Sequence, residues 1–303
     1  MPQIDKGWIK DSFLYTGLFL FLLASIHIPF IHWLALWIIP FPFFVLRVKQ
    51  PLNAMVIPLI GMVILLLIGF PLWYILLGVL AGCVGVVMGS IYRQAKMTGT
   101  DVVLGGLVSG FIVSLISMGV MQWAFRFFDT LNAMWQKEWN QAQNILQQSG
   151  LTMPEEIIPP VEAFVLIFLL MALVPMVLIT FAAARRWLVS KGYESKTLPP
   201  FYEWRLPKAF FYFFVIVLLL QWFVVAEESG QNFQWIISIL LILHILFFVQ
   251  GLSLIAFLLR RKRKSLVWLV PAILLAWFPP VSFVILLMGM IDAGTPLRKR
   301  MEK

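Results

Sequence analysis

The chain has 303 residues, of which 61% are hydrophobic and only 12% are charged, whereas soluble domains are roughly half apolar. Apolar runs recur almost from end to end, so we expect a membrane protein with several spans and little sequence left for a soluble catalytic domain. The net charge of +9 lies in short clusters beside apolar runs, a pattern typical of cytoplasmic helix ends, and we expect no nucleic-acid partner. The lone Cys83 excludes an intrachain disulfide and any multi-cysteine metal site.

The predicted fold class is all-α, a polytopic helical membrane protein. Pro29 divides the first apolar block, because proline removes a helix hydrogen bond, and the sequence GFP at Gly69–Pro71 forms a tight turn between two later spans. Eight spans are predicted, at residues 12–28, 32–46, 52–69, 71–91, 102–125, 162–184, 209–226 and 233–259.

A last apolar block covers residues 266–290. As a simple ninth span it would export the basic tail PLRKRMEK, against the preference of Lys and Arg for the cytoplasm. Pro279–Pro280 offers a second interpretation, in which the block splits into a re-entrant hairpin and the tail stays in the cytoplasm. We favour the hairpin.

The distribution of charge orients the eight spans. Basic residues cluster in every second connection, from Lys6 and Lys10 to the RRKRK sequence at 260–264. The intervening connections are neutral or acidic. The chain is therefore expected to be a multi-pass protein of the bacterial plasma membrane with a cytoplasmic N-terminus.

The only long polar stretch lies between the fifth and sixth spans, at 127–161. Its apolar residues follow the three-and-four spacing of one helical face, with Asp129 as the N-cap and Gly150 as the stop. This predicts an amphipathic helix near 129–149 on the outer surface, either as a connector resting on the membrane or as a lid over an outer site.

Small residues recur at four-residue spacing in two spans, which allows helix backbones to approach closely where lipid supplies no hydrophobic drive. We therefore expect these two helices to pack tightly. The residues concerned are Gly78, Gly82, Gly85, Gly89, Gly106 and Gly110.

Polar and aromatic residues gather at the predicted outer ends of the spans. Aromatic walls with a few polar groups are typical of a small-molecule site, although an aromatic belt at the membrane interface has the same composition. His27 and His32 flank the Pro29 break and are expected to be polar caps or parts of a wet vestibule, since a metal site needs three or four ligands. The candidate ligand-binding residues are His27, His32, Trp73, Tyr74, Gln122, Trp123, Arg126 and Glu162.

No enzyme motif is present. The sequence has no Gly-rich phosphate loop, no GxSxG elbow, no HExxH and no acidic pair within a span. We expect no catalytic residue, no metal and no cofactor, and any ATP-driven process would need another subunit.

The stretch PPFYEWRLPKAF at 199–210 crowds aromatic, charged and proline residues before an apolar span. We interpret it as an elbow in which Pro207 begins the next helix, Tyr202 and Trp204 lie at the headgroup level, and Arg205 faces lipid phosphate. A docking site for a partner is the alternative.

Together with the C-terminal GMIDAGTPLRKR, Trp204, Leu206 and Pro207 before an apolar span resemble the YybS-type family of bacterial membrane proteins over most of the chain. The first six helices of that family are similar to the substrate-binding (S) components of energy-coupling-factor vitamin transporters. The resemblance implies a six-helix unit at 1–190 and appended helices at 199–303. It also implies coupling and ATPase subunits as candidate partners, with Gly17, Ala24 and Ser25 as docking residues.

Three hypotheses of function follow. The first is a non-enzymatic protein that binds or transports a small molecule from the outer face. The second is a membrane scaffold that acts through its cytoplasmic loops without a ligand. The third is an intramembrane enzyme that uses His27 or His32.

Overall fold

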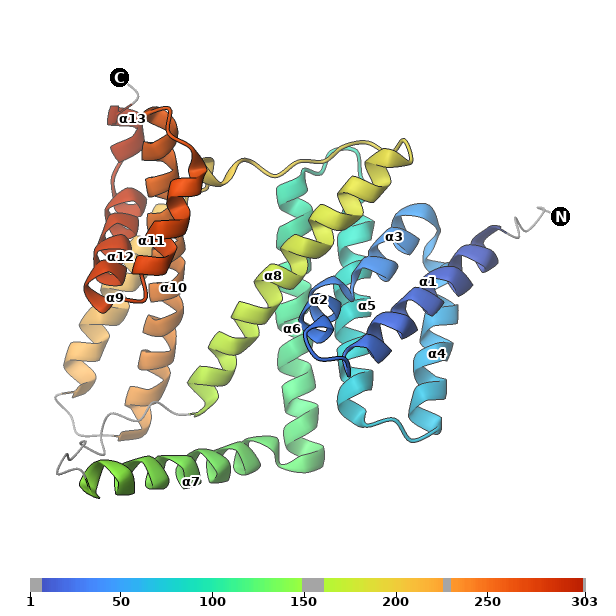
Figure 1. Ribbon diagram of the computed structural model, residues 1–303, viewed down its shortest axis with the longest axis horizontal. Helices are drawn as coiled ribbons and strands as arrows, with labels where there is room; N and C mark the ends of the chain where they lie inside the picture. Colours follow the sequence, from blue (N-terminus) through green and yellow to red (C-terminus); the bar gives the residue numbers. More distant parts are fainter. Residues whose placement is uncertain (1–6, 149–160, 226–229, 302–303) are drawn as a thin grey trace. The chain divides into compact units, whose positions relative to one another are not determined.

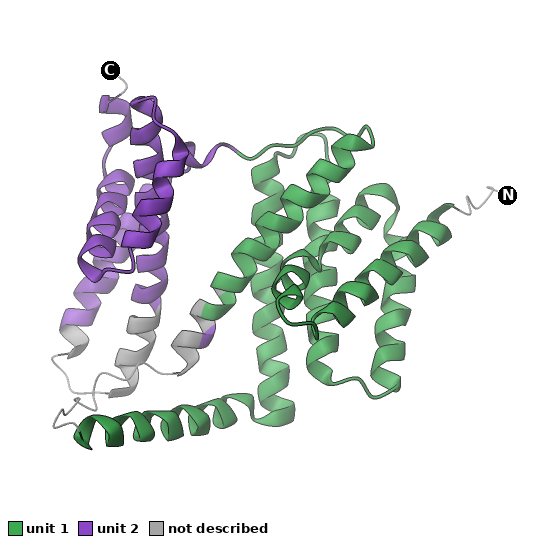
Figure 2. Cartoon of the chain, viewed as in Figure 1, with its two compact units in different colours: residues 1–149, 168–198 green, residues 150–167, 199–303 purple. Residues whose placement is uncertain are grey.

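The computed structural model describes residues 7–148, 161–225 and 230–301, which contain helices and no strand. The chain divides into two compact units, as Figure 2 shows. The first unit comprises Met1–Ser149 and Phe168–Leu198, and the second comprises Gly150–Ile167 and Pro199–Lys303.

The helices of the first unit follow one another with short connections (Figure 1). In chain order they are α1 (Gly7–Ser25), α2 (Ile31–Ile38), α3 (Phe41–Lys49), the 3-10 turn η1 (Leu52–Met55), α4 (Val56–Leu67), α5 (Leu72–Tyr92), α6 (Gly99–Phe125), α7 (Phe127–Gln148) and α8 (Val161–Ser190), whose first residues belong to the second unit.

Prolines determine where the early helices end. The predicted break at Pro29 is confirmed, because α1 ends at Ser25 and α2 begins at Ile31. The predicted span at 32–46 is present, because Ile31–Lys49 is long and apolar enough to cross a membrane, but it is not one uninterrupted helix. The chain breaks again between α2 and α3, where Pro40 precedes α3 and Pro42 occupies its first turn, a position at which a missing N–H is harmless.

The four glycines predicted to pack α5 against α6 contact other segments instead. A Cβ on Gly85 would lie 2.5 Å from the carbonyl oxygen of Pro40, and one on Gly89 would lie 2.8 Å from that of Phe44. These two glycines therefore admit α3. Gly78 faces Phe19 and Met62, and Gly82 faces Met62 and Phe43.

The glycines of α6 accept side chains from two neighbouring helices. Gly106 lies against Met88 of α5 and Val177 of α8, and Gly110 against Leu173 of α8 and Val84 of α5. Helices α5 and α6 do pack along each other, as expected. The glycines of α5 and α6 do not face each other, because Met88 and Val84 of α5 occupy the space beside Gly106 and Gly110 of α6.

Basic helix ends meet at one end of the first unit. Lys49 forms a 2.8 Å ion pair with Asp11 of α1, and Arg93 donates to the carbonyl of Gln50 at 3.0 Å. Lys196, only 5% exposed, donates to the carbonyls of Gln94 and Met97 in the α5–α6 connection. Segments that the charge pattern assigned to one side of the membrane thus lie together in space.

The amphipathic helix predicted near 129–149 is present as α7. It leaves α6 at Arg126, which has the left-handed φ of 50°, and turns sharply away from the axis of α6 (Figure 1). The predicted stop at Gly150 lies outside the described residues.

The second unit contains fewer helices. They are the 3-10 turn η3 (Phe201–Glu203), α9 (Lys208–Val225), α10 (Gly230–Arg261), the 3-10 turn η4 (Leu266–Trp268), α11 (Leu269–Leu275), α12 (Pro279–Gly294) and α13 (Leu297–Met301). Its small core includes Phe214 of α9, Phe247 of α10 and Leu286 of α12.

The last apolar block is split at Pro279, which starts α12 together with Pro280. The chain reverses between α11 and α12, and α12 runs back along α10 to the end where α13 lies (Figure 1). The crossing is close because glycines meet there: a Cβ on Gly251 would lie 1.9 Å from the Ile285 carbonyl oxygen, and one on Gly289 1.8 Å from that of Phe247. A helical hairpin is therefore observed, and its re-entry into the membrane and the cytoplasmic side of the tail stay predictions.

Among the described residues, six helices are long and apolar enough to cross a membrane, against eight predicted spans. The two predicted spans at 52–69 and 209–226 correspond to shorter apolar helices, Leu52–Leu67 and Lys208–Trp222. The larger count of eight therefore stays a prediction.

Candidate functional site

His27 and Tyr74 are in direct contact, although 47 residues separate them. The Tyr74 hydroxyl is hydrogen-bonded to the imidazole of His27, with 3.3 Å to Nδ1 and a shorter contact to Nε2. Tyr74 lies in the first turn of α5 and is 4% exposed, whereas His27 lies in the α1–α2 turn and is exposed. The contact therefore holds an accessible imidazole against a buried phenol.

Aromatic rings surround this pair. Trp73 stacks on Tyr74 with 3.4 Å between ring centroids, and Phe70 meets Tyr74 edge-on at 5.8 Å. Trp73 is 44% exposed and Phe70 is 40% exposed, so both rings present surface to the surroundings. We name the group of His27, Phe70, Trp73 and Tyr74 the aromatic cluster.

The turn that carries His27 contains a strained residue. Phe30 has φ 68° and ψ −34°, which is a rare conformation for a bulky residue and costs of order 1–3 kcal/mol. Its ring is 89% exposed, so packing of this side chain does not offset the strain. Strained backbone persists where the surrounding structure determines it, and such residues gather at functional sites.

His32 does not join His27. Its ring lies on Trp33, with 5.0 Å between centroids. The part of the chain that the structure describes also contains no group of three or more His, Cys, Asp or Glu residues arranged to hold a metal ion.

The candidate residues of α6 form a second group at the α6–α7 corner. The Gln122 side-chain oxygen accepts a hydrogen bond from the Phe128 N–H at 2.7 Å, and Arg126 pairs with Asp129 at 2.7 Å. Trp123 is 87% exposed. Within the described residues no hydrogen bond joins this corner to the aromatic cluster, and the Glu162 side chain lies outside them.

The second unit contains a buried ionic network that the sequence reasoning missed. Arg298 of α13 binds both carboxylate oxygens of Asp292 of α12, with Nε 3.0 Å from each and Nη2 2.5 Å from Oδ2. The side chains are 7% and 0% exposed. Gln250 of α10 donates to the same carboxylate, and Ser253 of α10 accepts from Arg298 at 3.1 Å. Arg298, Asp292, Gln250 and Ser253 form what we call the buried network.

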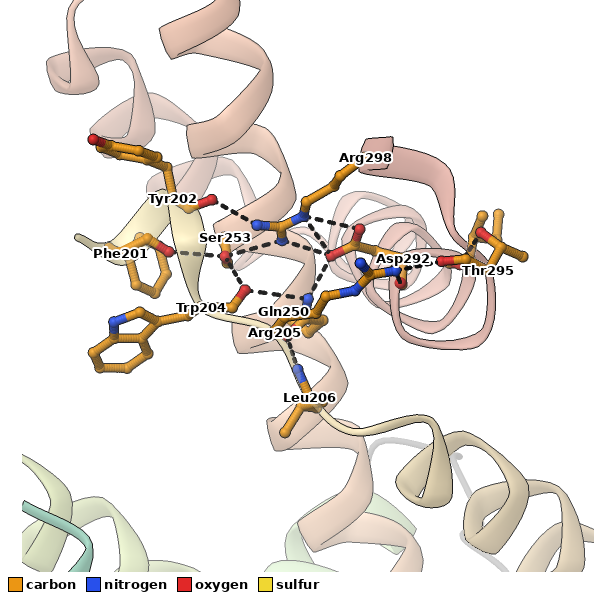
Figure 3. Close-up of polar contacts among 11 residues, drawn as sticks. Phe201, Tyr202, Trp204, Arg205, Leu206, Gln250, Ser253, Asp292, Thr295 and Arg298 are labelled. Carbon is orange, nitrogen blue, oxygen red and sulfur yellow. Dashed lines mark hydrogen bonds and ion pairs between the residues drawn. The ribbon is translucent and has the colours of Figure 1, made fainter. Parts of the chain in front are cut away.

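The buried network holds the elbow in place, as Figure 3 shows. The Ser253 hydroxyl lies 2.8 Å from the carbonyl oxygens of both Phe201 and Trp204 and donates its one hydrogen to this pair of acceptors. Arg298 donates to the Tyr202 carbonyl at 2.6 Å, and the Leu206 N–H donates to Gln250 at 2.9 Å. Most of the elbow lies outside helices and lacks their regular backbone hydrogen bonds, so these side chains bond its N–H and carbonyl groups instead.

The elbow side chains also have partners within the second unit. Tyr202 lies under the guanidinium of Arg260, 5.0 Å from the ring centroid, and the Trp204 indole N–H donates to the Pro199 carbonyl at 2.9 Å. Arg205 donates to the Thr295 carbonyl at 2.7 Å. Its guanidinium thus caps the end of α12 while the residue remains exposed, and the contact of Arg205 with lipid phosphate stays a prediction.

The buried network holds the elbow backbone in position and leaves no free polar group on Arg298 or Asp292 for chemistry. Every nitrogen of the Arg298 guanidinium has an acceptor, and both Asp292 oxygens are occupied. The sequence did contain a signal, because Gln250 lies within the apolar span at 233–259 and Asp292 lies just beyond the apolar block at 266–290, and polar groups at such positions are costly unless they have a role.

One comparison with known proteins finds a match. A family model described as a predicted membrane protein (DUF2232) matches residues 18–293, which is most of the chain. The chain belongs to this family. No curated protein and no solved structure matches. A membrane-embedded helical protein is thus established by both the family and the apolar helices.

Proposed function

We propose that this chain is a non-enzymatic membrane protein that binds or transports a small molecule from the outer face, in the manner of an S component. The observation that carries the proposal is the hydrogen bond between Tyr74 and His27 within the aromatic cluster. It combines ring surface for stacking with a polar pair for orientation, as small-molecule sites do. The strain at Phe30 supports the same location.

The aromatic cluster also favours a class of ligand. Its members are rings and an imidazole, whereas the charged residues at the α6–α7 corner, Arg126 and Asp129, pair with each other. We therefore propose an uncharged molecule with a flat ring and at least one hydrogen-bonding group. The half-exposed faces of Trp73 and Phe70 would stack on that ring.

The orientation belongs to this proposal. The basic ends of the first unit lie together near Lys49 and Arg93, and basic residues favour the cytoplasmic side. We propose a plasma-membrane location with that end in the cytoplasm, which assigns a cytoplasmic N-terminus and puts the aromatic cluster at the outer face.

A coupling subunit with ATPases is part of the S-component interpretation. Of the small residues on α1, Gly17 has nothing within 4 Å of an added Cβ and Ala24 is exposed. The two are seven residues apart and share one helix face. Ser25 is turned inward and donates to the Phe21 carbonyl at 2.7 Å. Gly17 and Ala24 therefore support docking on α1, and Ser25 does not.

Native mass spectrometry of the full chain, gently extracted from its own membranes, tests the ligand. The wild type is expected to retain a small molecule that Tyr74→Phe and His27→Gln release. His244→Gln is the matched control, because His244 bonds the Leu240 carbonyl in the other unit, and it should retain the molecule. An identical spectrum for all four proteins, or a wild type without a bound molecule, contradicts the proposal.

The second candidate is a membrane scaffold that acts through its cytoplasmic loops. The buried network favours it, because four side chains are devoted to holding the elbow in one conformation. Co-purification distinguishes the two candidates. A transport component brings coupling and ATPase subunits, and a scaffold brings other partners. The third hypothesis is an enzyme that uses His27 or His32, and retained cellular function in both His27→Ala and His32→Ala would remove it.

A further inference from the structure

Cations from three distant segments gather at one end of the second unit. Residues 201–208, 260–264 and 292–301 contain ten Lys and Arg residues but only two carboxylates, Glu203 and Asp292. Asp292 is fully buried by its pairing with Arg298. Glu203 is thus the one exposed carboxylate in these segments. We name the three segments the basic end.

The basic end has a defined geometry. Arg298 ties α13 to the elbow through the Tyr202 carbonyl, and Arg260 at the end of α10 lies over the Tyr202 ring. Arg205 ties the elbow to the end of α12. The charged surface is therefore held by the buried network, and its cations need little reorganisation to meet an anion.

Apolar side chains adjoin these cations. Directly after the RRKRK sequence, Val267 is 70% exposed and Trp268 is 59% exposed. Lys264 lies 5.9 Å from the centroid of the Trp268 ring. A tryptophan beside a lysine at the start of an apolar hairpin is typical of the interface between headgroups and hydrocarbon.

We propose that the basic end binds the phosphate headgroups of anionic phospholipids, with Trp268 and Val267 entering the adjacent acyl region. An acidic protein or RNA would use the cations alone, and would leave Val267 and Trp268 without a role. A lipid satisfies both sets of side chains, because its phosphate meets Lys and Arg while its chains meet the apolar residues. This inference is independent of the aromatic cluster and of any ligand there.

The test titrates the delipidated full chain in detergent with phosphatidylglycerol or with zwitterionic phosphatidylcholine, and counts bound lipid by native mass spectrometry. We expect tighter binding of phosphatidylglycerol that weakens as salt is raised. The variant Arg261→Gln, Lys262→Gln, Lys299→Gln removes three exposed cations that lie outside the buried network. Each Lys or Arg near an anionic surface contributes about fivefold, so this variant should bind phosphatidylglycerol about a hundredfold more weakly.

A matched control changes the same charge in the first unit. Lys96→Gln, Arg186→Gln, Lys191→Gln replaces three exposed cations there and should retain most of the binding. Trp268→Ser keeps the charge but removes the apolar contact, and it should also weaken lipid binding. Equal thermal unfolding midpoints of the lipid-free variants exclude misfolding as the cause.

Three results would overturn the proposal. The first is equal affinity for the two lipids, and the second is wild-type affinity in the triple Gln variant of the basic end. The third is RNA or an acidic protein that co-purifies with the wild type and is retained equally by Trp268→Ser.

Discussion

Arg298 and Asp292 form a bidentate ion pair at 2.5–3.0 Å in which neither side chain is more than 7% exposed. The pair joins α13 to α12, and the remaining guanidinium nitrogen reaches the elbow. Ions taken out of water need such complete pairing, since each loses several kcal/mol of hydration. The stability of the second unit should therefore depend on both residues together.

Removing one partner of this pair should destabilise the second unit strongly. Asp292→Asn and Arg298→Gln each leave one buried charge unpaired, which costs about 3–5 kcal/mol. The double variant Asp292→Leu, Arg298→Met should lose less than the sum. Equilibrium unfolding in mixed micelles measures the coupling. Lys299→Gln on the same helix is exposed and should change stability by less than about 0.5 kcal/mol.

The crossing of α10 and α12 should not tolerate a methyl group. Gly251→Ala and Gly289→Ala place Cβ within 2 Å of backbone carbonyl oxygens, and because backbone cannot move aside as a side chain does, each should cost about 1–3 kcal/mol or more. Gly119→Ala, with nothing within 4 Å, is the control and should be neutral or slightly stabilising. Thermal unfolding in detergent compares the three, and equal midpoints would refute the close crossing.

Lys196 should order the connection between α5 and α6. Its buried ammonium binds the Gln94 and Met97 carbonyls, so Lys196→Met leaves both acceptors unpaired at a cost of about 1–3 kcal/mol. Hydrogen exchange should then become faster at residues 93–98 and 194–198. Lys191→Met, an exposed lysine nearby, should leave exchange there unchanged. Unaltered protection in Lys196→Met would show that the contact is not needed.

Phe30 should limit stability because of its backbone. Glycine adopts positive φ readily, so Phe30→Gly should stabilise the first unit by about 1 kcal/mol, and the ring is too exposed for its packing to be missed. The thermal unfolding midpoint gives the result. A lower midpoint would mean that the observed φ is not strained. If the turn serves the aromatic cluster, the same variant should release the bound molecule.

The tail and the RRKRK segment should lie on the same side of the membrane. Arg298 and Arg260 both contact Tyr202, so the two segments cannot lie on opposite sides. In a Cys83→Ser background, Lys299→Cys and Lys262→Cys should both resist an impermeant thiol reagent in intact cells. Gln141→Cys in α7 should react. Opposite labelling of the first two would contradict the hairpin at Pro279.

The sequence was sufficient to predict most helices and several of their ends. A helix in hydrocarbon satisfies its own backbone, so apolar length and local proline positions carry the information. The segments at 71–91 and 102–125 correspond to α5 and α6, and the spacing of apolar residues predicted α7. The break at Pro40 was missed because proline within one turn of a helix start is compatible with both a break and a continuous span.

The contacts between helices were decided by the tertiary structure. Four-residue spacing showed that Gly85 and Gly89 admit a neighbour, and only the fold shows that the neighbour is α3. The contact of His27 with Tyr74 joins residues 47 apart, and Arg298 reaches Tyr202 across 96 residues. Periodicity describes one helix at a time. A buried polar group bonds whichever partner the fold brings within about 3 Å. The spacing of residues along one helix contains no information about which residue of another helix that is.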